Sequence, residues 1–210
     1  MVHARAYGLP RRREVRRLGA TVVTLLLIAG AVGAAPPGGF RGGALDPPRP
    51  APDFTLKAHD GTAFSLSEQR GHVVALVFGY TFCPDVCPTT LAELAQVRSR
   101  LEPTAAARLR VAFVTVDPER DDAARLRAYT QAFDRAFVGL TGTPGELVAV
   151  QKAYGVIVKK HVAKGTSAAY LVDHSAFVYV IDGEGRLRLM LPFGTSIDTM
   201  THDIGLLLGR

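Results

Sequence analysis

Short apolar runs alternate with amphipathic stretches along most of the chain, and their order predicts an α/β fold. Runs rich in β-branched and aromatic residues predict buried strands at 73–78, 110–116 and 137–140. Apolar residues at helical spacing between these runs predict helices that begin at Pro88, Asp122 and Pro144. Strands that alternate with helices form a layered sandwich around a central sheet.

Two hairpins and a last helix complete the predicted domain. One hairpin pairs 53–56 with 63–66, and the other pairs 176–181 with 186–191 around Asp182-Gly183-Glu184-Gly185. Ser196 can cap a final helix, and the polar stretch 159–169 predicts a loop. We therefore expect a central mixed sheet with an added N-terminal hairpin and a C-terminal hairpin plus helix.

The first 52 residues differ in pattern from the rest. Residues 1–17 are basic, and residues 18–35 are apolar throughout, which predicts a signal anchor or a cleaved signal peptide. Residues 36–52 hold six prolines and four glycines, which predicts a tether before a domain at 53–210. We expect an anchor in the cytoplasmic membrane with the N-terminus on the inner side, and a domain in the periplasm or another extracytoplasmic space. The alternative is that the leader is cleaved and the domain is secreted.

Charge excludes one class of partner. The formal net charge is +6, but six arginines against one glutamate already give +5 within residues 1–17. The predicted domain is therefore near neutral and has no basic stripe, so the sequence does not indicate nucleic-acid binding.

Cys83 and Cys87, the only cysteines, lie between a predicted strand and a predicted helix. The N-terminus of a helix stabilises thiolates, and residues four apart share a helix face, so both sulfurs can converge on one atom. This placement is that of a thioredoxin-like fold. Three residues separate the cysteines, however, and 145–191 contains no proline to face them, which counts against a generic thioredoxin.

His174 is the best-placed third ligand, because it precedes the strand at 176–181 where that proline would stand. Two thiolates and one imidazole suit Cu(I), and can hold Cu(II) with an added ligand, whereas a closed zinc site would need a fourth protein ligand. Three carboxylates are candidates for supporting or docking roles: Asp173, Asp117 and Asp85. Parallel strand ends should bring Asp117 near the cysteines.

Four segments together resemble the Sco/SenC family: Gly79-Tyr80-Thr81-Phe82-Cys83-Pro84-Asp85-Val86-Cys87-Pro88, Val116-Asp117-Pro118-Glu119-Arg120-Asp121, Gly139-Leu140-Thr141-Gly142 and Val172-Asp173-His174-Ser175. The resemblance implies a membrane-tethered copper chaperone that assists assembly of the dinuclear copper centre of cytochrome c oxidase. It implies Cys83, Cys87 and His174 as copper ligands, and a cysteine pair that cycles between dithiol and a Cys83–Cys87 disulfide. Phe82 departs from the family pattern, where many relatives have a polar residue.

Three functions stay open at this stage. The resemblance implies a metallochaperone rather than an enzyme, with subunit II of the oxidase as recipient and an upstream copper donor. A thiol–disulfide oxidoreductase that reduces the recipient's cysteines needs both thiols but not His174. The third alternative is a copper or redox sensor. We expect four other histidines of the domain to be solvated: His59, His72, His161 and His202. Met190 and Met200 are candidate soft copper ligands, but Met190 lies in a strand pattern and we expect it to pack in the core.

Overall fold

The computed structural model describes residues 39–162 and 170–209, and the predicted basic region and apolar segment, 1–35, lie outside this part. Ten strands are present in the described residues: β1 Ala44–Pro50, β2 Thr55–Ala58, β3 Ala63–Ser65, β4 Val73–Gly79, β5 Leu109–Thr115, β6 Val138–Thr141, β7 Val158–Val162, β8 Tyr170–His174, β9 Phe177–Ile181 and β10 Arg186–Pro192. The helices are η1 Leu66–Gln69, α1 Val86–Arg100, α2 Pro103–Ala106, α3 Ala123–Gln131, α4 Pro144–Ala153 and α5 Ile197–Leu208.

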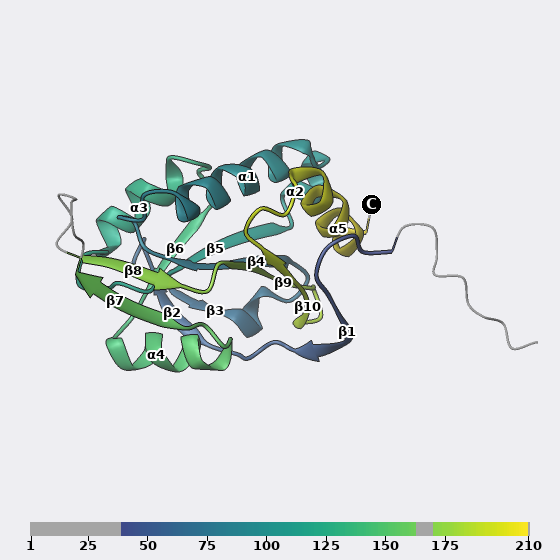
Figure 1. Cartoon of the computed structure of the whole chain (residues 1–210). Coiled ribbons are helices and arrows are strands. Elements are labelled where there is room, and N and C mark those ends of the chain that lie inside the picture. The colour runs from purple at the N-terminus through teal and green to yellow at the C-terminus, as the bar shows by residue number, and fades with distance from the viewer. Residues whose placement is uncertain (1–38, 163–169, 210) are drawn as a thin grey trace, which may run out of the picture. The chain divides into compact units, whose positions relative to one another are not determined.

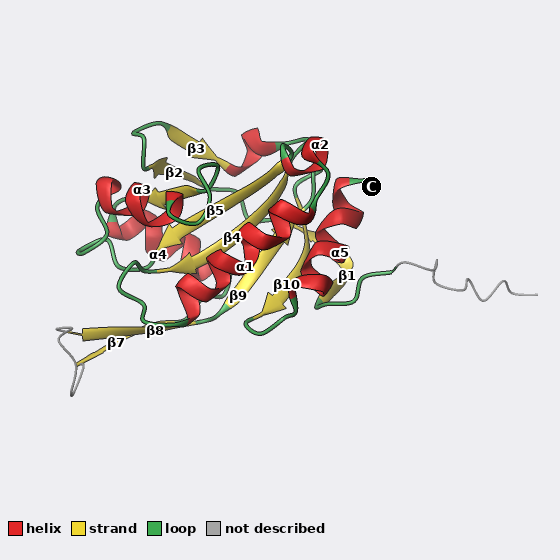
Figure 2. Cartoon of the chain, turned by 90° about the horizontal axis from the view of Figure 1, so that it is seen from above, coloured by secondary structure: helices red, strands yellow, loops and turns green. Residues whose placement is uncertain are grey.

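Eight of the strands form one mixed sheet in the order β1-β10-β9-β4-β5-β6-β2-β3. The neighbours β4, β5 and β6 are parallel, whereas β9 pairs with β4 in the antiparallel sense. Every residue of β4 is buried, because helices cover the sheet on both faces. Figures 1 and 2 show α1, α3 and α5 on one side and α4 on the other. The predicted mixed α/β sandwich is confirmed.

Three helices, α3, α4 and α5, begin at residues whose side chains cap them, whereas α1 has no side-chain cap and begins earlier than predicted. Asp122 accepts from Arg125 N, Thr143 forms a capping box with Glu146, and Ser196 accepts from Thr199 N. The helix predicted to begin at Pro88 begins at Val86 instead. A proline in the first turn removes no intrahelical bond, so it marks the first turn and not a single residue. Cys87 therefore lies inside α1.

The predicted tether at 36–52 is wrong for residues 44–50, which form β1 and pair with β10. Met190 N also donates to the carbonyl of Gly43, and Arg41 N and Gly42 N donate to Asp203 in α5. Proline is tolerated here because β1 is an edge strand whose outer N–H groups have no strand to bond. The folded domain thus begins before residue 53.

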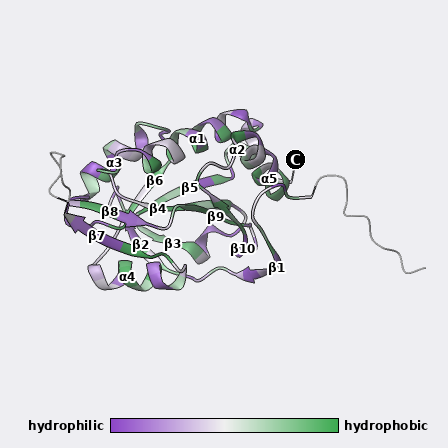
Figure 3. Ribbon diagram, in the orientation of Figure 1, coloured by the Kyte–Doolittle hydropathy of each residue, from purple (hydrophilic) through white to green (hydrophobic). Residues whose placement is uncertain are grey.

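The predicted loop at 159–169 is wrong for residues 159–162, which belong to β7. β7 and β8 pair with each other in a two-stranded sheet separate from the main one, and we call these two strands the arm. Figure 3 shows β7 as hydrophilic, in contrast to the apolar central strands. The connection at 163–169, with Gly165, lies outside the described residues.

No helix in the described ranges, 39–162 and 170–209, combines the length and apolar character needed to span a bilayer. The anchor predicted at 18–35 lies outside these ranges and stays a prediction.

Candidate metal centre

The cysteine loop, residues 80–87, leaves the end of β4 and enters α1. Cys83 N donates to the Tyr80 carbonyl at 3.2 Å, and Cys87 N donates to Cys83 Sγ at 3.4 Å. The buried carboxylate of Asp121 accepts from both the backbone N and the hydroxyl of Thr81, at 3.0 and 2.6 Å. Asp121 also accepts from the Thr115 hydroxyl at 2.8 Å, so the loop is tied directly to β5.

Gly79 lets the second cysteine lie against the end of β4. A Cβ atom at this position would be 2.8 Å from Cys87 Sγ and 2.6 Å from the Phe113 ring, closer than real Cβ contacts. Cys87 is buried at 1% exposure, whereas Cys83 is half-buried. Both are free thiols. The loop therefore presents one accessible sulfur and one enclosed sulfur.

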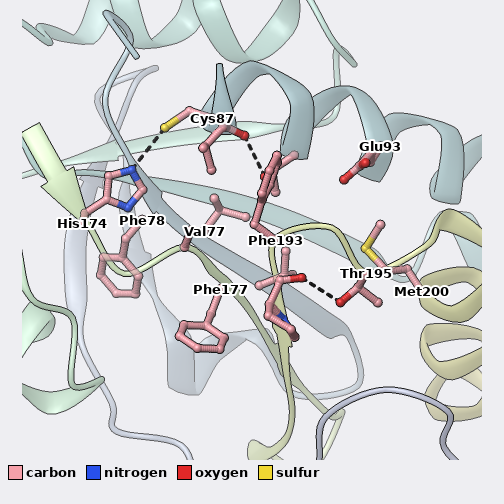
Figure 4. Close-up of a pocket in the computed structure, with 14 residues that line it drawn as sticks. Val77, Phe78, Cys87, Glu93, His174, Phe177, Phe193, Thr195 and Met200 are labelled. Atoms are coloured by element: carbon pink, nitrogen blue, oxygen red, sulfur yellow. Dashed lines mark hydrogen bonds between the residues drawn. The ribbon is translucent and has the colours of Figure 1, made fainter. Parts of the chain in front are cut away.

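His174 ends β8 and turns its ring toward the cysteine loop. Its Nε2 lies 3.4 Å from Cys87 Sγ, as the dashed line in Figure 4 shows. Its Nδ1 lies 3.1 Å from the Ser175 carbonyl, which can only accept a hydrogen bond, so Nδ1 carries a proton and a neutral ring has its lone pair on Nε2. The ring also packs edge-on against Tyr80, with centroids 6.2 Å apart. The imidazole is thus oriented to offer Nε2 to the same point as the sulfurs.

The candidate ligand atoms of Cys83, Cys87 and His174 all lie within 4.8 Å of one another. Within the described residues, these three side chains form the one group of histidine, cysteine and acidic residues whose ligand atoms are close enough to share a metal ion. Two sulfurs with one imidazole form a soft donor set that suits copper. The residues present therefore fit copper.

The two thiols differ in acidity. Hydrogen bonding to the Cys87 side chain, together with contacts to His174 and to the backbone N–H groups of Cys87 and Asp85, lowers the pKa of Cys83 to about 4. The same hydrogen bond, together with burial, raises the pKa of Cys87. Cys83 is therefore a thiolate at neutral pH, and Cys87 is the thiol that donates to it.

Two of the three carboxylates singled out in the sequence, Asp85 and Asp173, line the same cavity as Cys83 and His174. Asp173 is 76% exposed and lies 3.5 Å from His161 across the arm. The Asp85 side chain is exposed and accepts only a long bond from Thr89, although its backbone N–H reaches Cys83. Asp117 is fully buried and binds Arg120, Tyr170 and Lys160. The acid that holds the cysteine loop is Asp121.

The expectation of solvated histidines holds for His161 alone. His59 accepts from Gly139 N at 2.9 Å, and its pKa is lowered mainly by burial. His72 lies 3.0 Å from Arg110, and His202 lies 2.8 Å from Asp203. Met190 is half-buried in β10, as predicted, and Met200 is buried in the core. Figure 4 places Met200 beside Glu93, across the pocket from His174.

Three residues of this region were missed as contributors by sequence reasoning: Gly79, Tyr170 and Ser175. The Ser175 hydroxyl accepts from Ile157 N, and Ser175 N donates to the Ile157 carbonyl, so these two bonds join the ends of the arm nearest the domain. Each of the three stands within or beside a quoted motif. Their contacts join segments far apart in the chain, however, and no local pattern shows them.

Comparison with known families places the chain. A family model described as SCO1/SenC matches residues 43–209. The bovine mitochondrial protein called SCO2 homolog is 37% identical over 153 residues, which are 72% of this chain and 57% of that protein. The chain spans about half the length of the curated mammalian relatives that it matches.

Solved structures agree with this placement. The apo Sco1 protein from Thermus thermophilus is 39% identical with a TM-score of 0.71, over 80% of this chain and 96% of that one. ScoI from Bradyrhizobium japonicum, solved with copper bound, is 32% identical with a TM-score of 0.67, over 75% of this chain and 98% of that one.

Proposed function

Because this chain belongs to the SCO1/SenC family, we propose that it is an extracytoplasmic metallochaperone that carries copper to the dinuclear copper site of cytochrome c oxidase subunit II. Cys83, Cys87 and His174 hold the cargo. The observation that carries the proposal is the convergence of these three side chains from two separate segments, with the imidazole tautomer set by Ser175. The proposal includes an upstream copper donor and a membrane anchor at 18–35.

Cys83, Cys87 and His174 have different roles in binding and releasing copper. The Cys83 thiolate is accessible and already charged, so it is the first donor that incoming copper meets. Cys87 must lose its proton when it binds, and the cation favours that loss. His174 completes the set through Nε2, which already faces the sulfurs. Release reverses this order as thiolates of the recipient replace the donors one at a time.

The difference in thiol acidity favours one alternative, a thiol–disulfide reductase. In that reaction Cys83 attacks a substrate disulfide and forms a mixed disulfide, with one substrate sulfur leaving as a thiolate. Cys87 then loses its proton and attacks Cys83, which forms the Cys83–Cys87 disulfide and reduces the substrate by two electrons. His174 takes no part in this sequence, so it separates the two functions.

The deciding experiment is an anaerobic Cu(I) competition titration of the reduced full-length protein, beside His174→Ala and His161→Ala. His161 is the matched control, because it is an exposed histidine on the same arm whose partner is Asp173 and not a sulfur. We expect one tightly bound copper per chain, at least about tenfold weaker affinity for His174→Ala, and wild-type affinity for His161→Ala.

Reduction of a test disulfide provides the second measurement on the same proteins. The chaperone proposal expects His174→Ala to retain disulfide exchange, whereas Cys83→Ser and Cys87→Ser lose both activities. Equal copper affinity in the wild type and His174→Ala would overturn the ligand assignment. Weak copper binding by the wild type with rapid disulfide reduction would establish the reductase instead.

A further inference from the structure

We propose that Tyr170 is a positioning residue for His174: its hydroxyl anchors the arm to buried Asp117 and so sets where the imidazole stands relative to the two sulfurs. This inference rests on the proposed function, because it concerns the same site. Tyr170 touches none of the candidate ligand atoms and acts only through β8.

The arm needs such an anchor because its strands hydrogen-bond only to each other and not to the main sheet. Val172 of β8 packs in the core, and side-chain hydrogen bonds hold the strand further along its length. Ser175 binds Ile157 at the base, and Val172 N donates to the Tyr80 hydroxyl at 3.3 Å in the middle. At the outer end, the Tyr170 hydroxyl donates to Asp117 Oδ1 at 2.6 Å. Only the last of these is a short bond to a carboxylate.

Asp117 is a strong anchor point. It follows β5, is fully buried, and its carboxylate also accepts from Arg120 Nε at 2.5 Å, while its backbone N–H donates to the Thr115 hydroxyl at 2.9 Å. Lys160 of β7 lies 3.5 Å from Asp117 and 2.9 Å from Glu119. Hydrogen bonds to a buried carboxylate contribute more than neutral ones. Both strands of the arm are therefore attached to the end of β5.

Arg120 joins this anchor to the cysteine loop. Its guanidinium stacks 3.7 Å from the Tyr170 ring centroid and 4.8 Å from that of Phe82, beside Cys83. It also donates to the Tyr170 carbonyl at 3.1 Å. The Arg120 guanidinium thus lies between the loop that carries the thiols and the strand that carries the imidazole. Movement of Tyr170 therefore changes the position of that strand relative to the loop.

Because Tyr170 and His174 belong to the same short strand, fixing Tyr170 restricts where His174 can lie. Side chains two apart in a strand face the same side, so Tyr170, Val172 and His174 all face the body of the domain. Asp173, on the opposite face, is 76% exposed. Fixing Tyr170 at one end and Ser175 at the other leaves His174 little freedom to turn, whereas loss of the Tyr170 anchor leaves the strand held at its middle and base.

The test is Tyr170→Phe in the reduced full-length protein, with Tyr154→Phe as the matched control. Both changes remove one hydroxyl, and the Tyr154 hydroxyl donates to the Pro52 carbonyl away from the site. Tyr170→Phe also retains the ring that stacks on Arg120. We expect Tyr170→Phe to weaken Cu(I) affinity about fivefold to tenfold and Tyr154→Phe to leave it unchanged, with the alkylation rate of Cys83 unchanged in both.

A double-mutant cycle with His174→Ala separates positioning from general damage. If Tyr170 acts through His174, Tyr170→Phe has no further effect on copper affinity in the His174→Ala background. An additional loss there would overturn the inference, as would wild-type affinity for Tyr170→Phe when His174→Ala binds weakly. If His174→Ala binds copper as tightly as the wild type, the ligand assignment fails, and the positioning role fails with it.

Amide hydrogen exchange tests the anchor without metal. We expect the amides of β7 and β8 to exchange at least about tenfold faster in Tyr170→Phe, and those of β4 to be unchanged. Unchanged exchange in the arm would overturn the inference whatever the copper result. Lys160→Met, which removes a second attachment to Asp117 and Glu119, is the further variant should Tyr170→Phe fold poorly, and we expect faster exchange there too.

Discussion

The cysteine loop and the arm meet at the same point, but they are held there in different ways. The loop continues β4, in which every residue is buried, and is fixed by Asp121 and by close packing at Gly79. The arm has a polar strand, β7, and depends on side-chain bonds to Tyr80, Asp117 and Ile157. Burial of β4 and the bonds to Asp121 thus position the thiols, whereas the polar contacts of the arm, together with one buried residue, Val172, position the imidazole. We therefore expect the arm to open more readily than the cysteine loop.

The largest expected effect is that of truncating a core residue, which should destabilise the region around the cysteine loop far more than it changes local opening of the arm. Leu91 lies on α1 one turn after Cys87 and is fully buried, so Leu91→Ala should lower the free energy of unfolding by about 2–5 kcal/mol. Denaturant unfolding measures this loss. Amide exchange in the arm should change little, because the arm opens locally. Equal acceleration in β4 and β8 would show that the arm opens only with the whole domain.

The pH dependence of Cys83 tests the electrostatics of the loop. With its pKa lowered to about 4, Cys83 is a thiolate above that pH and becomes protonated below it. Its alkylation rate should therefore stay level between pH 8 and pH 5, where an ordinary thiol with a pKa of about 8.5 slows several hundredfold. Cys87→Ala should raise the midpoint more than His174→Ala does, since the Cys87 bond is the largest cause. A midpoint near pH 8 in the wild type would contradict this.

Asp173→Asn should have the smallest effect. The carboxylate is 76% exposed and its ion-pair partner is His161, so we expect a change in unfolding free energy below about 0.5 kcal/mol and copper affinity within about twofold of the wild type. The Cu(I) titration measures the affinity. A large loss of copper affinity would mean that the charge of the arm affects copper binding as well as its attachment to the domain.

Sequence patterns predicted the core elements well because their residues face a buried interior. The strands β4, β5 and β9 are apolar over nearly their whole length, and the caps at Asp122, Thr143 and Ser196 are local signals. β7 was missed because its sequence, Val-Lys-Lys-His-Val, has no core face and forms a strand only beside β8. β1 was missed because its prolines are typical of a linker.

The candidate ligands could be predicted because cysteine and histidine are metal-binding residue types wherever they stand. The residues that position these ligands could not be predicted in the same way. Tyr170 and Asp117 are 53 positions apart, and Thr81 and Asp121 are 40 positions apart, so each pair exists only once the sheet has formed. Asp117 was expected near the cysteines from strand topology alone, whereas its contacts assign it to the arm.

The placement of β1 has a consequence for how copies of this domain behave toward one another. A sheet edge with free N–H groups invites the addition of a further strand from another chain. The outermost strand at this edge contains Pro47, Pro48 and Pro50, none of which has an N–H to donate. The opposite edge is β3, only three residues long. Both ends of the sheet are therefore poor templates for strand addition, which favours a domain that resists aggregation.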